Sequence, residues 1–305
     1  MESKKQSKKA ICNGISFLIT NGKTPNYLHS RYSVGTILEG DLVLKPFEAI
    51  YLFSVEKITC EIGQKMTLAN LLPALLTDEE IPMLRSYVEI KSDGAKISIE
   101  PDHFSVSKKH EKKSEGRQVF PIMENSSINP NWLIKTLNGF VSSVDEDGDI
   151  TLYQVTEEVI GKENTINTKD CNPISFGEHS LCEPESVPGW VGYNIGQVKI
   201  LSENETKYFK NKWDKSLSNR TYNFLVNNGM IVKSGFKYGC NFRVYKSSID
   251  LHSEFLILLL EKDLEWFEVS RAVRVANSVK KGMLFATEFE NKLVFVKVKR
   301  VRSLF

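Results

Sequence analysis

Tyr245 and His252 are two residues able to transfer protons, and only a short segment separates them. Tyr245 ends the alternating stretch NFRVY, and His252 lies at the beginning of the apolar run LHSEFLILLL. The alternation predicts a strand with Phe242 and Val244 pointing inward and with Tyr245 emerging among basic side chains. If the two segments pair as strands across KSSID, His252 lies near Tyr245. The same pattern also fits a surface tyrosine and an edge histidine without chemistry.

A helix predicted within residues 267–282 adds positive charge to this pair. Its apolar stripe at helical spacing consists of Val269, Ala272, Val273, Ala276 and Val279. Arg271, Arg274 and Lys281 lie on the opposite stripe, and Gly282 is the expected C′ residue beyond the helix. The helix dipole accounts for cations in the last turn, but not for a basic ridge that reaches back to Arg271. A phenol, an imidazole, an ammonium and a guanidinium without a carboxylate cluster suit a phosphodiester, with no metal and no cofactor.

Composition and charge set few limits on the partners of the protein. The chain has 305 residues, a formal net charge of +2 and five scattered cysteines, none of them in a CxxC pair. A zinc site is therefore not expected, and free thiols fit a reducing cytoplasm. No apolar run has transmembrane length, so we expect a cytoplasmic protein without membrane contact.

Two pairs of similar segments occur in the same order along the chain. YVEIKSDGAKISI begins at Tyr87 and YNFLVNNGMIVKS at Tyr222; later, FVSSVDEDGDITLYQV is matched by MLFATEFENKLVFVKV. Each first segment predicts a helix that passes through glycine into a strand, and each second segment predicts a hairpin. This order suggests a duplicated unit. The second copy carries FRVY and SVKKG where the first has DHFSV and TLNGF, so a catalytic copy would be the second.

The motifs of the second copy resemble those of a known family. GMIVKSGFKYGCNFRVY, HSEFL and RAVRVANSVKKGMLFA are similar to segments of the archaeal tRNA-splicing endonucleases. In the first half, LKPFEAIYL resembles the amino-terminal domain of the family, and VDEDGDITLY resembles the acidic loop of its inactive repeat. The resemblance covers most of the chain and is strongest over residues 229–298.

The resemblance implies a metal-independent cut of intron-containing precursor tRNA, or of another RNA with a bulge–helix–bulge. Tyr245 matches the general base that takes the proton of a 2′-hydroxyl, His252 the general acid, and Lys281 the residue that stabilises the transition state. The products would be a 2′,3′-cyclic phosphate and a 5′-hydroxyl. A free phenol has a pKa of about 10, so a tyrosine base needs cations nearby.

The resemblance also implies RNA contacts and an assembly. Arg274 matches an arginine that stacks on a flipped-out base, with Arg271 beside it on the ridge, and the position of its usual companion falls on Lys297. Arg300 or Arg302 could replace that lysine. A homodimer is implied, in which an acidic turn docks on a basic pocket of the other subunit. The residues of that turn are Asp145, Glu146, Asp147 and Asp149. The alternative is an ordinary acidic hairpin turn in solvent.

The predicted fold class is α+β, with a duplicated unit made of a small α/β amino-terminal domain and a mixed-sheet carboxy-terminal domain. The expected parts are the amino-terminal domain of repeat 1 over 1–84, its non-catalytic carboxy-terminal domain over 85–160, a connection over 161–189, a reduced amino-terminal part of repeat 2 over 190–228, and the catalytic domain over 229–305. Two other functions remain open: a non-enzymatic RNA-binding protein, and a structural subunit of a heteromeric endonuclease.

Overall fold

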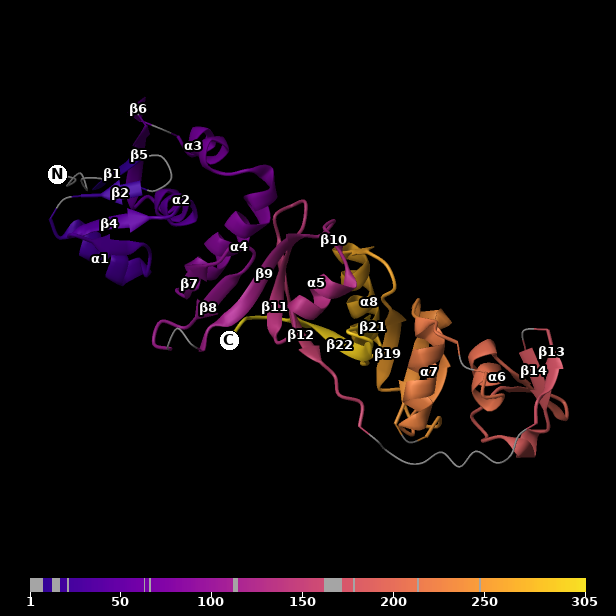
Figure 1. The fold of residues 1–305 in the computed structure, drawn as a ribbon. Coiled ribbons are helices and arrows are strands. Elements are labelled where there is room, and N and C mark those ends of the chain that lie inside the picture. Colours follow the sequence, from indigo (N-terminus) through magenta and orange to yellow (C-terminus); the bar gives the residue numbers. More distant parts are fainter. Residues whose placement is uncertain are drawn as a thin grey trace. The chain divides into compact units, whose positions relative to one another are not determined.

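The computed structural model describes residues 8–12, 17–20, 22–62, 64–65, 67–111, 115–161, 172–177, 179–212, 214–246 and 248–305. The protein is mixed α+β and contains a large mixed sheet (Figure 1), as the sequence predicts at this level. The chain forms two compact units. Unit 1 comprises residues 1–124, 139–152 and 303–305, and unit 2 comprises 125–138 and 153–302. No helix in the described ranges is long and apolar enough to span a membrane.

The amino-terminal part of unit 1 is a six-stranded sheet with the order β3-β4-β2-β1-β5-β6. Its elements are β1 Lys8–Cys12, β2 Phe17–Ile19, α1 Thr24–Tyr32, β3 Thr36–Leu38, β4 Asp41–Leu44, α2 Pro46–Ser54, β5 Ile58–Ile62, β6 Gln64–Lys65 and α3 Leu68–Leu75. Helix α2 starts at Pro46. Proline suits this first helical position, because the N–H that it lacks would have no partner within the helix.

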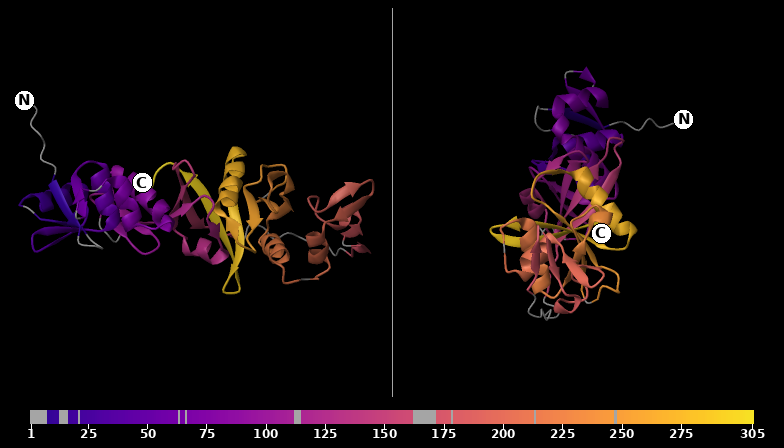
Figure 2. Two further views of the ribbon diagram at one scale, coloured as in Figure 1. Left: turned by 90° about the horizontal axis from the view of Figure 1, so that it is seen from above. Right: turned by 90° about the vertical axis from the view of Figure 1, so that its right-hand side faces the viewer.

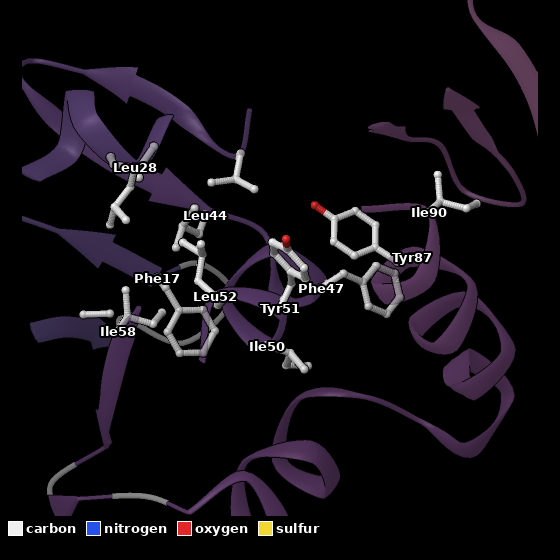
Figure 3. Close-up of a cluster of buried hydrophobic side chains, with 14 of the residues drawn as sticks. Phe17, Leu28, Leu44, Phe47, Ile50, Tyr51, Leu52, Ile58, Tyr87 and Ile90 are labelled. Carbon is white, nitrogen blue, oxygen red and sulfur yellow. The ribbon is translucent and has the colours of Figure 1, made fainter. Parts of the chain in front are cut away.

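Aromatic side chains fill the core that joins this sheet to the next helix (Figure 3). Tyr87 stacks on Phe47 with ring centroids 6.1 Å apart, and meets Tyr51 and Phe104 edge-on. Such pairs stabilise beyond the area that they bury. Burial, with Glu48 nearby, raises the pKa of the Tyr87 phenol well above its usual value, so this hydroxyl stays neutral.

The rest of unit 1 pairs α4 with a set of four strands. Its elements are the 3₁₀ turn Asp78–Glu80, α4 Ile81–Ser92, β7 Lys96–Ile99, β8 Phe104–Ser107, β9 Arg117–Met123 and β11 Gly139–Val144. The strands lie in the order β11-β9-β8-β7; β7/β8 and β8/β9 are antiparallel and β9/β11 is parallel. Helix α4 leads through Gly94, at φ 79°, into β7, as the sequence predicts.

Unit 2 contains a small sheet with the order β13-β14-β16-β15 and helix α6. The elements are β13 Ile174–Phe176, β14 His179–Cys182, the 3₁₀ turn Pro184–Ser186, β15 Tyr193–Ile195, β16 Val198–Leu201 and α6 Glu203–Phe209. Ser202 and Glu205 form a capping box at the start of α6. Of the predicted connection 161–189, residues 162–171 and 178 lie outside the described residues.

The larger part of unit 2 is built on the strand order β17-β18-β19-β21-β22 (Figure 2 shows the long β21–β22 hairpin in yellow). The elements are α7 Leu217–Asn227, β17 Ile231–Ser234, the 3₁₀ turn Phe236–Tyr238, β18 Phe242–Tyr245, β19 Phe255–Leu259, β20 Leu264–Glu265, α8 Trp266–Ser278, β21 Gly282–Phe289 and β22 Lys292–Val301. Three further elements precede them in sequence: β10 Ser127–Ile128, α5 Pro130–Lys135 and β12 Ile150–Glu157.

The two helices of this part cover different faces of its strands. Leu225 and Val226 of α7 share a buried cluster with Ile257, Leu284 and Ala286. Side chains alternate along a strand, so residues such as Met283 and Phe285 point to the other face, where α8 contacts β21 and β22. The predicted apolar stripe of α8 provides that contact, with Val269, Val273 and Ala276 fully buried.

Candidate active site

The three predicted catalytic residues occur at one end of three neighbouring strands. Strand β18, which ends at Tyr245, runs antiparallel to β19, with Val244 opposite Phe255. Strand β19 runs parallel to β21, with Phe255 opposite Gly282. The end of β18 therefore meets the beginnings of β19 and β21. His252 lies three residues before β19, and Lys281 immediately precedes β21.

Backbone and side-chain hydrogen bonds tie these strand ends together. The Lys281 Nζ donates to the carbonyl oxygen of Ser253 at 2.8 Å, so the ammonium is held beside the residue that follows His252. Gly282 N donates to the Glu254 oxygen at 2.8 Å, and Glu254 N donates to the Val244 oxygen at 2.9 Å. The segment that carries His252 is thus anchored to both neighbouring strands.

Tyr245 lies on the same face of its strand as Arg243, but it does not emerge into solvent as predicted. Only 7% of the residue is exposed. The Arg243 guanidinium lies 5.8 Å from the centroid of the Tyr245 ring and 6.0 Å from that of Tyr238. On the other side, Ile231 of β17 is the register partner of Tyr245. The phenol therefore has a cation close to its ring in a partly desolvated place, where charges interact more strongly than in water.

His252 is exposed and precedes its strand, rather than beginning it. Its imidazole forms no hydrogen bond or ion pair with any residue in the described part of the chain, so both ring nitrogens are open to a ligand. The neighbouring Ser253, by contrast, is 5% exposed. An exposed imidazole next to a fixed backbone can reach a substrate without first giving up a protein partner.

The end of α8 differs from the prediction. The left-handed residue is Lys280, at φ 56°, and not Gly282. Lys280 N donates to the Asn277 oxygen and Lys281 N to the Ala276 oxygen, which is the hydrogen-bond pair of a Schellman motif. Gly282 is required for a different reason: a Cβ there would lie 2.9 Å from Cδ1 of Phe255. The close approach of β21 to Phe255 places Lys281 over the Ser253 carbonyl.

The structure separates the predicted RNA-contact residues into two sets. Arg271 and Arg274 lie exposed on α8, and Arg274 Nη2 donates to Ser270 Oγ at 3.1 Å. Lys297 is the register partner of Leu284, so it points to the face covered by α7. There its Nζ binds Glu158 Oε2 at 2.8 Å.

Arg300 points to the other face of β22, because it lies an odd number of positions, three, after Lys297. That is the face on which α8 packs. Arg300 is also exposed, and the antiparallel register places it next to the start of β21. The sequence alone could have given this result by counting the register through the hairpin.

In unit 1, the predicted interface residues occupy the turn between β11 and β12. One carboxylate oxygen of Asp145 is bonded within this turn, because Oδ1 accepts a hydrogen bond from Asp149 N at 2.8 Å. Arg85 Nε donates to the Gly148 oxygen at 2.8 Å and so holds the turn against α4. The side chains of Glu146, Asp147 and Asp149 are exposed. Three carboxylates are thus available at the surface of unit 1.

No group of three or more His, Cys, Asp or Glu in the described ranges is arranged to hold a metal ion. Cys240, before β18, is a free thiol whose Sγ points to the carbonyl oxygens of Gly235 and Phe242. Burial raises the pKa of this thiol to about 11, so it stays protonated at neutral pH. It is therefore not a nucleophile for this site.

Residues 217–295 match the model of the tRNA intron endonuclease catalytic C-terminal domain. A tRNA-splicing endonuclease from Thermoplasma volcanium is 32% identical over 295 residues, which cover 96% of this chain and 98% of that protein. The chain belongs to the tRNA-splicing endonuclease family. A tRNA-splicing endonuclease from Picrophilus torridus is 27% identical over 295 residues, covering 96% and 97% of the two chains. One from Thermococcus onnurineus is 30% identical over 118 residues, covering 35% of this chain and 69% of that one.

The family membership makes the chain an endonuclease, and the matched domain includes Tyr245, His252 and Lys281. It also includes α7 and α8, which cover the two faces of the strands that carry these residues. The identity over nearly the whole length extends the relationship to unit 1.

Proposed function

We propose that this tRNA-splicing endonuclease cleaves precursor tRNA at the intron–exon junctions of a bulge–helix–bulge, without a metal ion. The observation that carries the proposal is the meeting of Tyr245, His252 and Lys281 at one end of β18, β19 and β21. These residues supply a base, an acid and a fixed positive charge, which is the set that a phosphodiester transfer needs.

In the proposed reaction, Tyr245 takes the proton of a ribose 2′-hydroxyl, and the 2′-oxygen attacks the adjacent phosphorus. The bond from phosphorus to the 5′-oxygen breaks, and His252 gives that oxygen a proton. The products are a 2′,3′-cyclic phosphate and a 5′-hydroxyl. The nucleophile belongs to the RNA, so the protein needs no serine or cysteine for the attack.

Two cations support these steps at different places. Arg243 lies 5.8 Å from the Tyr245 ring centroid and places a positive charge beside the proposed base. Lys281 carries its charge beside the His252 segment and stabilises the negative charge that develops on the phosphoryl oxygens. Lys281 is held by a neutral carbonyl and not by a carboxylate, so its full charge remains available to the substrate.

For RNA binding, we assign the base contact to Arg274, with Arg271 on the same exposed ridge. A planar guanidinium can stack on an unpaired base and a lysine cannot. Arg300 is our choice for the companion of Arg274, in place of Lys297. Its strand register directs it to the face of α8, whereas Lys297 is ion-paired with Glu158.

We also propose a duplicated architecture that forms a homodimer. The strand order and directions of β7-β8-β9-β11 repeat in β17-β18-β19-β21, and the Thermococcus relative matches with 69% of its length but only 35% of this chain. Glu146, Asp147 and Asp149 would dock on positive charge of the second subunit. A two-fold dimer with two identical sites suits a substrate that is cut twice.

The test is cleavage of a model bulge–helix–bulge RNA by the purified chain in excess EDTA, with analysis of the product ends. We expect cuts at both junctions, with cyclic phosphate and 5′-hydroxyl ends, and no cutting by Tyr245→Phe. Ser107→Ala, at the matching position of unit 1, is the control and should cut normally. Cleavage that needs added metal would overturn the mechanism. Binding without any cleavage by the wild-type chain would favour the structural-subunit alternative.

A further inference from the structure

A ridge of α8 connects the interior of unit 2 to Arg274. Trp266, Ser270 and Arg274 follow one another at intervals of four residues, so they lie in one row along the helix. The Tyr153 ring meets the Trp266 ring edge-on, with centroids 5.2 Å apart and an interplanar angle of 81°. The Tyr153 Oη lies 2.5 Å from Ser270 Oγ, and Arg274 Nη2 donates to that same Oγ at 3.1 Å.

The three polar groups form a continuous hydrogen-bonded chain from a buried end to an exposed end. Tyr153 is 2% exposed and Ser270 is 5% exposed, whereas Arg274 is exposed. A serine hydroxyl can accept a bond from the guanidinium and share another with the phenol. Packing against Trp266 fixes the phenol, so Ser270 is held at the place where Arg274 needs an acceptor.

We propose that Tyr153 is a positioning residue, which acts through Ser270 to orient the Arg274 guanidinium before RNA binds. The inference rests on the proposed base contact of Arg274. A free arginine side chain loses much rotamer freedom when a ligand orders it, and orientation in advance removes part of that cost. Tyr153 lies 117 residues before Ser270, outside the stretch 217–295 that carries the catalytic-domain match.

The experiment measures RNA affinity and cutting rate separately for Tyr153→Phe and Ser270→Ala. Phenylalanine keeps the ring that packs on Trp266 and removes only the hydroxyl. With an RNA that carries a 2′-deoxy at the cleavage site, we expect binding about 3- to 10-fold weaker. With cleavable RNA at saturating enzyme, the single-turnover rate should stay unchanged. Tyr208→Phe, which removes a phenol bonded to Asn227 elsewhere in unit 2, is the matched control and should bind normally.

A double-mutant cycle decides between positioning and a general effect on the fold. In an Arg274→Ala background, Tyr153→Phe should weaken binding no further. An equal loss in both backgrounds would overturn the proposal, because Tyr153 would then act without Arg274.

A measurement on the free protein keeps this inference separate from the base contact. We expect the ¹⁵N signals of the Arg274 guanidinium to show restricted rotation in the wild type and averaged rotation in Tyr153→Phe. If Arg274→Ala leaves the affinity unchanged, the base contact is wrong and these signals still test the orientation. Identical guanidinium signals in wild type and Tyr153→Phe would overturn the positioning role.

Discussion

Strands β7, β8, β9 and β11 of unit 1 and strands β17, β18, β19 and β21 of unit 2 share one plan and differ in chemistry. Both sets contain two antiparallel pairs followed by a parallel pair. In unit 1, Ser107 is the register partner of Lys96; in unit 2, Tyr245 is the partner of Ile231. Serine thus stands in unit 1 where unit 2 has the proposed base. The same strand plan carries a proposed site in one unit and none in the other.

The position before the last of these strands differs as well. Val119 pairs with Phe140 in unit 1, and Ile257 pairs with Leu284 in unit 2. Counting back from these pairs places Leu137, in the segment 125–138 that leads into the strand β11 of unit 1 and is itself counted with unit 2, at the position that Lys281 has before β21. An apolar side chain cannot neutralise a phosphoryl oxygen. Two differences of residue type at one end of a similar arrangement therefore separate the two sets of strands chemically.

Other features are the same in both units and stabilise the backbone away from the proposed site. Gly35 N donates to Glu48 Oε1 at 2.7 Å, and Gly192 N donates to Glu205 Oε1 at 2.9 Å. Both glycines have positive φ, at 65° and 63°, and a Cβ on either would meet a backbone carbonyl oxygen of the neighbouring strand within 2.7 Å. The shared features hold the fold, and the features that differ lie at the proposed site.

After Tyr245→Phe, which should abolish cutting, the largest effect is expected at His252. His252→Ala should slow cleavage by about 10²- to 10⁴-fold, because the leaving 5′-oxygen would depart without a proton. A substrate with sulfur in place of that 5′-oxygen should restore the rate of His252→Ala, because a thiolate leaves without protonation. Single-turnover cleavage of both substrates is the measurement. If the sulfur substrate is not rescued, His252 is not the general acid.

Lys281→Ala is expected to lower the cutting rate by about 10²- to 10³-fold and to leave RNA affinity nearly unchanged. The lost charge would act mainly on the transition state. The adjacent Lys280→Gly is the control: it removes one charge and keeps the left-handed backbone conformation. Equal losses in the two variants would mean that positive charge in general, and not the placement of Lys281, matters.

The acidic turn of unit 1 should matter for assembly and not for chemistry. Replacing Glu146 and Asp147 by lysine should raise the dimer dissociation constant at least about 10-fold, by like-charge repulsion. Mass in solution over a range of concentrations measures it. Glu290→Lys, in the corresponding turn of unit 2, is the matched control. An unchanged mass of the double variant at all concentrations would remove the docking role.

The smallest expected effect concerns a buried lysine of unit 1. Burial lowers the pKa of Lys91 to about 8, while its Nζ donates to the carbonyl oxygens of Ser33 and Ala95. The unfolded chain then holds this proton up to a higher pH than the folded one, so unfolding free energy should rise between pH 8 and about 10.5.

In Lys91→Met, the rise of the unfolding free energy with pH should be smaller. The measurement is urea unfolding as a function of pH, followed by hydrogen exchange of unit 1 amides. The exposed Lys96→Met is the control and should keep the wild-type slope. Equal slopes in wild type and Lys91→Met would contradict the account.

The sequence predicted the local elements around the site well, because each had a clear signal. Alternation located β18, the helical stripe located α8, and Gly94 and Gly229 marked the entries into β7 and β17. The paired segments also predicted both hairpins. These signals depend on neighbours in sequence, which a single chain shows directly.

The errors concern packing between elements. The burial of Tyr245 depends on Arg243 and on the strand next to it, which alternation does not reveal. The left-handed residue is Lys280, and the glycine at 282 serves another purpose, the close approach to Phe255. The role of Tyr153 depends on a contact across 117 residues. Gly192 and Glu205 are thirteen positions apart, as are Gly35 and Glu48, which are bonded in the same way. This shared spacing was a signal in the sequence for the small sheet of unit 2.

The central claim is that Tyr245 activates the 2′-hydroxyl of the RNA itself. The most direct measurement is single-turnover cleavage, in excess EDTA, of RNA with a single 2′-deoxy nucleotide at one of the two cleavage positions. The modified junction should stay intact, while the other junction is cut at the normal rate to a cyclic phosphate. Cleavage at the deoxy position would contradict it, because the nucleophile would then have to come from elsewhere.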